Sequence, residues 1–180
     1  MSERLYLLEI QLVDIEPAIW RRFVVPASIT LDRLHDVIQI VMGWTDSLLH
    51  EFTIGKKRYT EYPESKEDGL ECGRYRLGDL VKQKGRTFLY LYDFGDGWEH
   101  ELLVEKILTS ESGAAYPRCL TGKRACPPED VGGVWGYADF LEAVRNPSHP
   151  EHKNMLTWAG GNFDPAAFDL AAVNLMLQQL

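Results

Sequence analysis

Residues 89–104 read Leu-Tyr-Leu-Tyr-Asp-Phe-Gly-Asp-Gly-Trp-Glu-His-Glu-Leu-Leu-Val, and this stretch decides how the chain folds. A glycine on each side of Asp96 gives the backbone access to positive φ, so residues 95–97 can close a tight hairpin. After the turn, the side chains that share one face of a strand are apolar apart from one histidine: Trp98, His100, Leu102 and Val104. The stretch therefore predicts a β-hairpin with a half-buried second strand.

The N-terminal part predicts two strands followed by a helix. Apolar residues alternate over residues 6–12 and again over 19–25, which is typical of strands that face a core. Thr30 suits a helix N-cap, and apolar residues recur at helical spacing over 31–41 until Gly43 offers a stop. This order resembles the opening hairpin and helix of a β-grasp arrangement.

The rest of the chain predicts shorter elements. Residues 50–54 and 58–62 form a second predicted hairpin, and residues 77–81 form a short helical turn. Towards the C-terminus, the sequence predicts a helix over 137–144 and a final helix with Asp164 as its N-cap and Pro165 in its first turn.

Two segments lack a regular spacing of apolar residues. Residues 63–73 are acidic and polar, so we expect an exposed loop that carries Cys72. Residues 116–137 combine proline, cysteine, tryptophan and glycine without periodicity, which predicts a long ordered loop. Long ordered loops in compact domains are usually functional.

Length and composition favour one domain over residues 1–180. A chain of 180 residues with 45% hydrophobic side chains can bury one substantial core. We therefore expect a single α+β domain with a mixed or antiparallel sheet packed against helices. No apolar run approaches the ~20 residues of a membrane span, and no signal-peptide core is visible. An odd set of three cysteines favours reduced thiols, and hence the cytoplasm.

The charge balance argues against direct nucleic-acid binding. The chain carries 19 basic and 27 acidic side chains, a formal net charge of −8. Binding to a phosphate backbone depends on clustered Lys and Arg, and the two short clusters at residues 21–22 and 56–58 are more typical of solvated faces. We expect a protein or a small molecule as the ligand instead.

Six residues form the predicted functional cluster, from the hairpin and the long loop: Asp93, Asp96, Trp98, His100, Glu129 and Asp130. Carboxylates and imidazole are ligands for magnesium, manganese or zinc, so a divalent metal is one possible cofactor. The alternative is structural: turn carboxylates accept backbone N–H groups and the histidine is satisfied in the core. We favour the structural interpretation, and expect protonated His100, Arg21 or Arg22 to balance the carboxylates if no metal does.

A mixed thiolate and imidazole zinc site is a weaker hypothesis. Cys119 and Cys126 could combine with His50 or His100, but their separation exceeds the two to four residues usual in zinc knuckles. His35 lies at the edge of the apolar stripe of the first helix, and we interpret it as a hydrogen-bonded packing residue rather than a ligand.

Several short sequence motifs, in the same order along the chain, closely resemble those of the plasmid pRiA4b Orf-3-like family. They are Asp-Ile-Glu-Pro-Ala-Ile-Trp-Arg-Arg at 14–22, Tyr-Asp-Phe-Gly-Asp-Gly-Trp-Glu-His at 92–100 and Cys-Pro-Pro-Glu-Asp-Val-Gly-Gly at 126–133. The resemblance covers almost the whole chain. It implies a single α+β domain, found alone or beside other modules in bacteria and archaea, an association with mobile elements, and no established activity. One difference is Leu48-Leu49-His50, where the family often has His-Leu-His.

Two classes of function are open. The first is a non-enzymatic interaction module, with exposed aromatic side chains at Trp98, Trp135, Tyr137 and Trp158. The second is a metal-dependent hydrolase or nuclease-like enzyme that uses the Asp, His and Glu residues of the predicted cluster to activate water. We favour the module, because the sequence contains no complete catalytic set.

Overall fold

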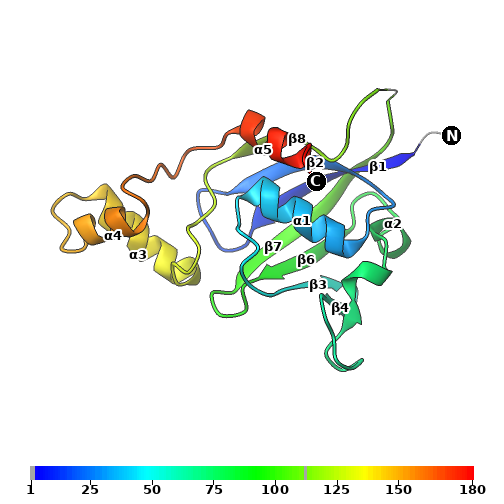
Figure 1. Cartoon of the computed structure of the whole chain (residues 1–180), viewed down its shortest axis with the longest axis horizontal. Helices are drawn as coiled ribbons and strands as arrows, with labels where there is room; N and C mark the ends of the chain where they lie inside the picture. Colours follow the sequence, from blue (N-terminus) through cyan, green and yellow to red (C-terminus); the bar gives the residue numbers. More distant parts are fainter. Residues whose placement is uncertain (1–2, 112) are drawn as a thin grey trace.

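The predicted hairpin lies in the middle of one large sheet in the computed structural model, which describes residues 3–111 and 113–180 (Figure 1). Its arms are β6 (Thr87–Tyr92) and β7 (Trp98–Thr109), which pair antiparallel. On its other side β7 pairs antiparallel with β1 (Arg4–Leu12), with an irregularity between Leu7 and Leu8. The hairpin thus connects the N-terminal strands to the middle of the chain.

The sheet contains eight strands in the order β5-β4-β3-β6-β7-β1-β2-β8. The remaining strands are β2 (Trp20–Pro26), β3 (His50–Ile54), β4 (Lys57–Thr60), β5 (Leu70–Glu71) and β8 (Arg118–Lys123). The β4–β5 pair is parallel and the other pairs are antiparallel. The sheet is therefore mixed.

The helix α1 (Leu31–Met42) covers one face of the sheet and follows the two opening strands as predicted (Figure 1). Thr30 is its N-cap residue, and Gly43 ends it with a left-handed φ of 108°. Its buried residues include Leu31, Leu34 and Ile38. They share one core with the alternate residues of β1 and β7, which confirms the expected single α+β domain.

The predictions for two loops were wrong in part. Residues 116–137 contain β8 and the start of α3 (Gly133–Arg145), because β8 adds to the edge of β2 although its own sequence has no clear alternation. Cys72 is fully buried at the start of the 3-10 turn η1 (Cys72–Arg74), which leads to the short helix α2 (Leu77–Leu80).

The C-terminal helices also differ from the prediction. A helix that was not expected, α4 (His152–Trp158), packs on α3, and the two project to one side of the sheet (Figure 1). The last helix, α5 (Leu170–Leu177), begins after Asp169, whose carboxylate accepts the N–H of Ala172 at 3.0 Å. Asp164 caps only an isolated turn, through the N–H of Ala166. α5 returns to contact β8 and α1.

The end of α1 is attached to the sheet by a buried arginine on β2. The Nε of Arg21 donates to the carbonyl of Val41 at 2.6 Å, and its other nitrogens reach the carbonyls of Met42, Trp20 and Lys123. The guanidinium carbon also lies 4.1 Å from the ring centroid of Phe168. Within the described ranges, no helix has both the length and the apolar character needed to cross a membrane.

Candidate functional site

The turn between β6 and β7 uses the carboxylate of Asp93 for its own closure. Asp93 has a φ of 63°, and its Oδ1 accepts the backbone N–H groups of Gly95 at 3.0 Å and Asp96 at 3.2 Å. Gly97 has the predicted positive φ, 72°, and donates its N–H to the carbonyl of Asp93 at 2.6 Å. Asp93 is therefore engaged as a turn residue.

Asp96 joins this turn to residues 126–133 of the long loop. Its Oδ2 accepts the N–H of Gly132 at 3.1 Å. The next residue, Gly133, has a φ of 73°, and a Cβ on it would lie 2.5 Å from the carbonyl oxygen of Asp96. Glycine is thus required where the loop meets the turn, and the structure brings these two predicted segments into contact.

Glu129 and Asp130 have different surroundings. The Oε1 of Glu129 accepts the N–H of Thr45 at 2.9 Å and the hydroxyl of Tyr92 at 3.1 Å. Burial raises the pKa of Tyr92 to about 12, so this hydroxyl keeps its proton and remains a donor. Asp130 is exposed, has a φ of 60° and lines a groove beside α3.

His100 and Trp98 lie in the core, without exposed surface. The Nδ1 of His100 contacts the carbonyl of Tyr90 at 3.1 Å, and its Nε2 accepts the indole N–H of Trp44 at 3.2 Å. This pairing fixes the tautomer with the proton on Nδ1. Burial lowers the pKa of His100 to about 4, so His100 is neutral and supplies no counter-charge at neutral pH.

The two arginines expected beside the carboxylates of the predicted cluster are elsewhere. Arg21 binds main-chain carbonyls at the end of α1, as described above. Arg22 points to the opposite face of the sheet, where it pairs with Glu105 at 3.0 Å and Glu9 at 3.4 Å. The expectation about these arginines was wrong, because Asp93, Asp96 and Glu129 accept N–H or O–H donors instead and Asp130 is exposed to solvent.

The metal-ligand sets proposed from sequence are not assembled. Cys72, Cys119 and Cys126 are free thiols, and the Sγ of Cys119 faces the carbonyl of Arg22 at 3.4 Å. Across residues 3–111 and 113–180, one group brings three potential ligand atoms within 4.8 Å of one another: His35, Asp36 and Asp46. His100 and the four carboxylates of the predicted cluster are not part of it.

His35, which was interpreted as a hydrogen-bonded packing residue, lies at the centre of a polar network. Its Nδ1 lies 2.7 Å from the hydroxyl of Tyr90, and its Nε2 lies 2.6 Å from the Oδ1 of Asp46. Gln39 closes the network, because its Nε2 donates to Tyr90 and its Oε1 accepts the N–H of Asp46. The sequence signal was a polar pair, His35 and Gln39, one turn apart on the buried face of α1.

His50 lies against this network. Its ring stacks on that of His35 with centroids 3.5 Å apart and planes inclined by 7°. His50 is only 2% exposed, and neither of its nitrogens has a hydrogen-bond partner in the described part of the chain. Burial lowers its pKa to about 3, so the ring is neutral.

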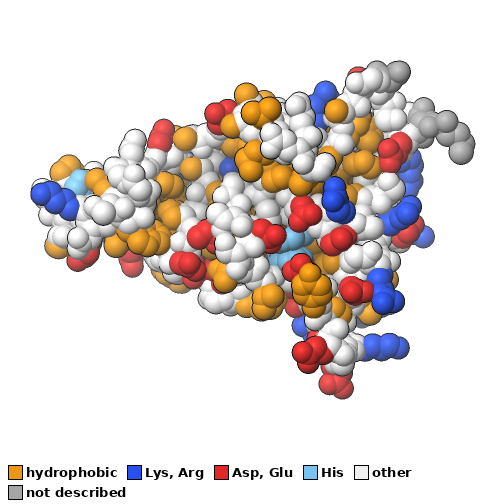
Figure 2. Space-filling model, in the orientation of Figure 1, with side chains coloured by type: hydrophobic (Ala, Val, Ile, Leu, Met, Phe, Trp, Pro, Cys, Tyr) orange, Lys and Arg blue, Asp and Glu red, His pale blue; other side chains and the backbone are white. Residues whose placement is uncertain are grey.

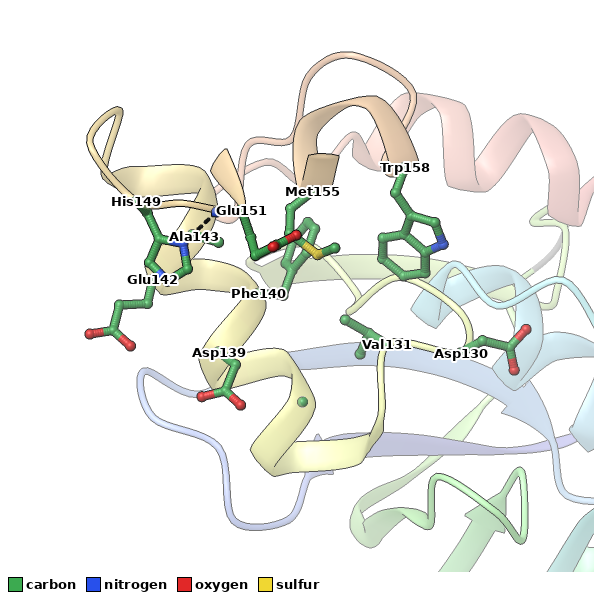
Figure 3. Close-up of a pocket in the computed structure, with 11 residues that line it drawn as sticks. Asp130, Val131, Asp139, Phe140, Glu142, Ala143, His149, Glu151, Met155 and Trp158 are labelled. Carbon is green, nitrogen blue, oxygen red and sulfur yellow. Dashed lines mark hydrogen bonds between the residues drawn. The ribbon is translucent and has the colours of Figure 1, made fainter. Parts of the chain in front are cut away.

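A groove lies between residues 130–131, α3 and α4 (Figure 3). Its volume is about 540 Å³. Apolar side chains form its inner surface: Val131, Phe140, Ala143, Met155 and Trp158. Carboxylates stand around it: Asp130, Asp139, Glu142 and Glu151. The loop 126–133 therefore serves two places, since it contacts the β6–β7 turn at one end and borders the groove beside α3.

The four aromatic side chains predicted to be exposed divide evenly. Trp135 is 85% exposed and Trp158 is 47% exposed, whereas Trp98 and Tyr137 are buried at 0% and 3%. Trp98 is buried because the register of β7 turns it to the core, together with His100. Of the exposed pair, only Trp158 borders the groove.

Comparison with known proteins agrees with the fold. The uncharacterized protein y4hQ of Sinorhizobium fredii (strain NBRC 101917 / NGR234) is 41% identical over 176 residues, 96% of this chain and 90% of that protein. The crystal structure of MM3350, a protein of unknown function from Methanosarcina mazei Go1, is similar with a TM-score of 0.88 and 37% identity, over 95% of this chain and 98% of that chain. The family model described as "Plasmid pRiA4b ORF-3-like protein" matches residues 4–172, and the chain belongs to this family.

Proposed function

We propose that this protein is a non-enzymatic binding module that takes a basic, partly apolar segment of a partner protein into the groove between α3 and α4. The observation that carries the proposal is the combination of an apolar inner surface with a ring of carboxylates. A segment that alternates basic and apolar side chains would match both parts of the groove.

The inner surface provides the contact energy. Met155 and Trp158 on α4 point toward Val131 and toward Phe140 on α3 (Figure 3). Trp158 keeps 47% of its surface exposed, so an apolar side chain of the partner can cover it. Partly exposed tryptophans in concave sites are frequent hot spots of binding, because they bury a large area at little cost in side-chain entropy.

The carboxylates provide selectivity. Asp130, Asp139, Glu142 and Glu151 are all exposed, and the formal net charge of the chain is −8. Their field attracts Lys and Arg and repels acidic ligands, including nucleic acid. Salt screens exposed charges of this kind, so binding should weaken as ionic strength rises.

Binding fits the described contacts better than hydrolysis at the predicted cluster. Asp93 directs one carboxylate oxygen to two backbone N–H groups of its own turn. His100 has both ring nitrogens engaged, with Tyr90 and Trp44. A catalytic base needs a nitrogen that faces the substrate, and His100 is fully buried.

The cellular setting is part of the same proposal. Three free thiols in one chain fit a reducing compartment, so we place the module in the cytoplasm. An association with mobile elements is proposed from the family description alone.

Fluorescence anisotropy with a labelled synthetic peptide tests the proposal. The probe alternates Lys or Arg with Leu or Trp, and a matched peptide carries Glu in place of each basic residue. We expect binding of the basic peptide only, and a loss of about tenfold or more in affinity for Trp158→Ala. Reversing the rim charge with Asp139→Lys and Glu142→Lys should also abolish binding.

Trp135→Ala is the matched control, because Trp135 is more exposed than Trp158 but does not line the groove. It should bind like the unmodified protein. Equal binding of the acidic and basic peptides, or equal loss in both tryptophan variants, would contradict the groove as the binding site. Mass spectrometry of the recovered peptide should show it intact, and cleavage would instead support the hydrolase.

A further inference from the structure

We infer that His35, Asp36 and Asp46 form a binding site for one divalent transition-metal ion, beside the stacked imidazole of His50. The three residues lie on α1 and in the loop that follows it, whereas the groove lies between α3 and α4. The inference is therefore independent of the function proposed above. It also differs from the cluster predicted on the β6–β7 turn.

The donor atoms are already close together. One atom from each of His35, Asp36 and Asp46 lies within 4.8 Å of the others, and the Nε2 of His35 is 2.6 Å from the Oδ1 of Asp46. An ion would take the place of the hydrogen between these two atoms, at about 2.0–2.2 Å from each ligand. Asp46 can move outward to make room, because its side chain is 55% exposed.

The donor set selects the class of metal. One imidazole with two carboxylates suits Zn²⁺, Mn²⁺, Fe²⁺ or Co²⁺, whereas Ca²⁺ and Mg²⁺ prefer sites made of oxygen alone. Asp36 is half-buried and Asp46 is exposed, so the ion would keep access to water on the side of Asp46. Figure 2 shows histidine atoms in the middle of the face that carries α1, with acidic side chains around them.

The contacts around His35 match those of metal-binding histidines. When Nε2 binds a metal, the proton must be on Nδ1, which faces the hydroxyl of Tyr90 at 2.7 Å. Gln39 donates to the same hydroxyl and also accepts the N–H of Asp46, so one side chain orients both ligands. Such supporting hydrogen bonds hold a ligand in the tautomer and orientation that binding requires.

His50 is the second, independent observation. A buried imidazole normally has a hydrogen-bond partner, yet both nitrogens of His50 are buried without one among residues 3–111 and 113–180. Its ring lies 3.5 Å from that of His35, on β3 directly beneath α1. Because the two rings are stacked, His50 can become a ligand of an ion on His35 only if its ring turns out of the stack, and one of these nitrogens then has a partner.

The competing explanation is that His35 and Asp46 only hold α1 and its loop together by a hydrogen bond. Asp46→Asn separates the two. The amide oxygen of asparagine can still accept a proton from His35, and asparagine suits the φ of 54° at this position. The substitution therefore keeps the hydrogen bond but removes the anionic ligand.

Isothermal titration of the untagged full chain with Zn²⁺ is the direct test. We expect one ion per chain, no binding of Ca²⁺ under the same conditions, and at least tenfold weaker binding in Asp46→Asn. Asp36→Asn should weaken Zn²⁺ binding similarly. Melting temperatures in EDTA should be the same for Asp46→Asn and the unmodified chain, which shows that the fold is retained.

Imidazole NMR identifies the residues involved. The chain has five histidines, so the ¹⁵N signals can be assigned one by one, and Zn²⁺ should shift those of His35 and His50. His149→Gln and Asp139→Asn are matched controls on the groove, and both should bind Zn²⁺ normally. Absence of binding, unchanged affinity in Asp46→Asn, or shifts confined to His149 and His152 would overturn the inference.

Discussion

His100 is an imidazole that the folded protein keeps neutral, since burial lowers its pKa from 6.5 to about 4. In the unfolded chain the same group titrates near its ordinary value. Above pH 6.5 it is neutral in both states and its contribution to stability is complete. As the pH falls below 6.5 the unfolded chain takes up the proton first, so the free energy of unfolding decreases until the folded pKa is reached.

We therefore expect His100 to account for about 3 kcal/mol of stability lost between pH 6.5 and pH 4. Urea unfolding at a series of pH values measures this slope. His100→Gln should reduce this slope, whatever its effect on stability at pH 7. The slope that remains should come from His50, whose pKa burial lowers to about 3. An unchanged slope in His100→Gln would show that His100 does not contribute to the loss.

Gly133 and Gly97 can be compared to measure how much the close contact between the loop and the turn depends on glycine. Their φ angles are almost equal, 73° and 72°, but only Gly133 is crowded, with a hypothetical Cβ 2.5 Å from Asp96. Gly97→Ala should cost about 1–2 kcal/mol of unfolding free energy, from the left-handed backbone alone. Gly133→Ala should cost clearly more, because the loop must also move away from the turn. Thermal melts measure the loss of stability in each variant. Equal losses in the two variants would mean that the loop moves away from the turn at little cost in free energy.

At the scale of elements, the neighbouring residues Arg21 and Arg22 show that the contribution of a charged side chain to stability depends on which face of the strand it occupies. Arg21 is 1% exposed and binds four main-chain carbonyls, two of them at the end of α1, and burial lowers its pKa to about 10. It remains charged at neutral pH. Arg22 faces the other side of the sheet, with a side chain that is 41% exposed.

Replacing each arginine by methionine tests this difference. Arg21→Met should cost on the order of 3 kcal/mol, because the carbonyls of Val41 and Met42 lose a charged donor. Arg22→Met should change stability far less, as expected for an exposed ion pair. Hydrogen exchange should accelerate at the end of α1 in Arg21→Met alone. Equal effects in the two variants would remove the special role of Arg21.

For the whole molecule, the sequence predicts those elements in which the spacing of apolar residues matches the face that is buried in the fold. The β1–β2–α1 opening and the β6–β7 hairpin both follow from alternation, capping and turn residues. β8 could not be predicted, since its strand state comes from pairing with β2 rather than from its own pattern. A short polar loop that contains Pro150 precedes α4, and the stability of this helix depends on packing against α3.

The candidate sites depended more strongly on tertiary contacts. The sequence identified the β6–β7 turn and the loop that meets it, because their glycines and carboxylates are local signals. It did not identify the group of His35, Asp36 and Asp46, which joins a helix to a loop beyond its end. The partnerless state of His50 depends on three-dimensional packing, and no spacing in the sequence encodes it.

The pairing of β1 with β7 has a consequence for synthesis on the ribosome. Leu8 pairs with Val104, so more than half of the chain must be made before β1 has its second neighbour. At about 5–20 residues per second, the free edge of β1 waits roughly 5–20 s for β7. During that time β2 covers only one side of an apolar strand, and an open strand edge can pair with another nascent chain. Slower translation between codons 12 and 98 should therefore lower the yield of folded protein.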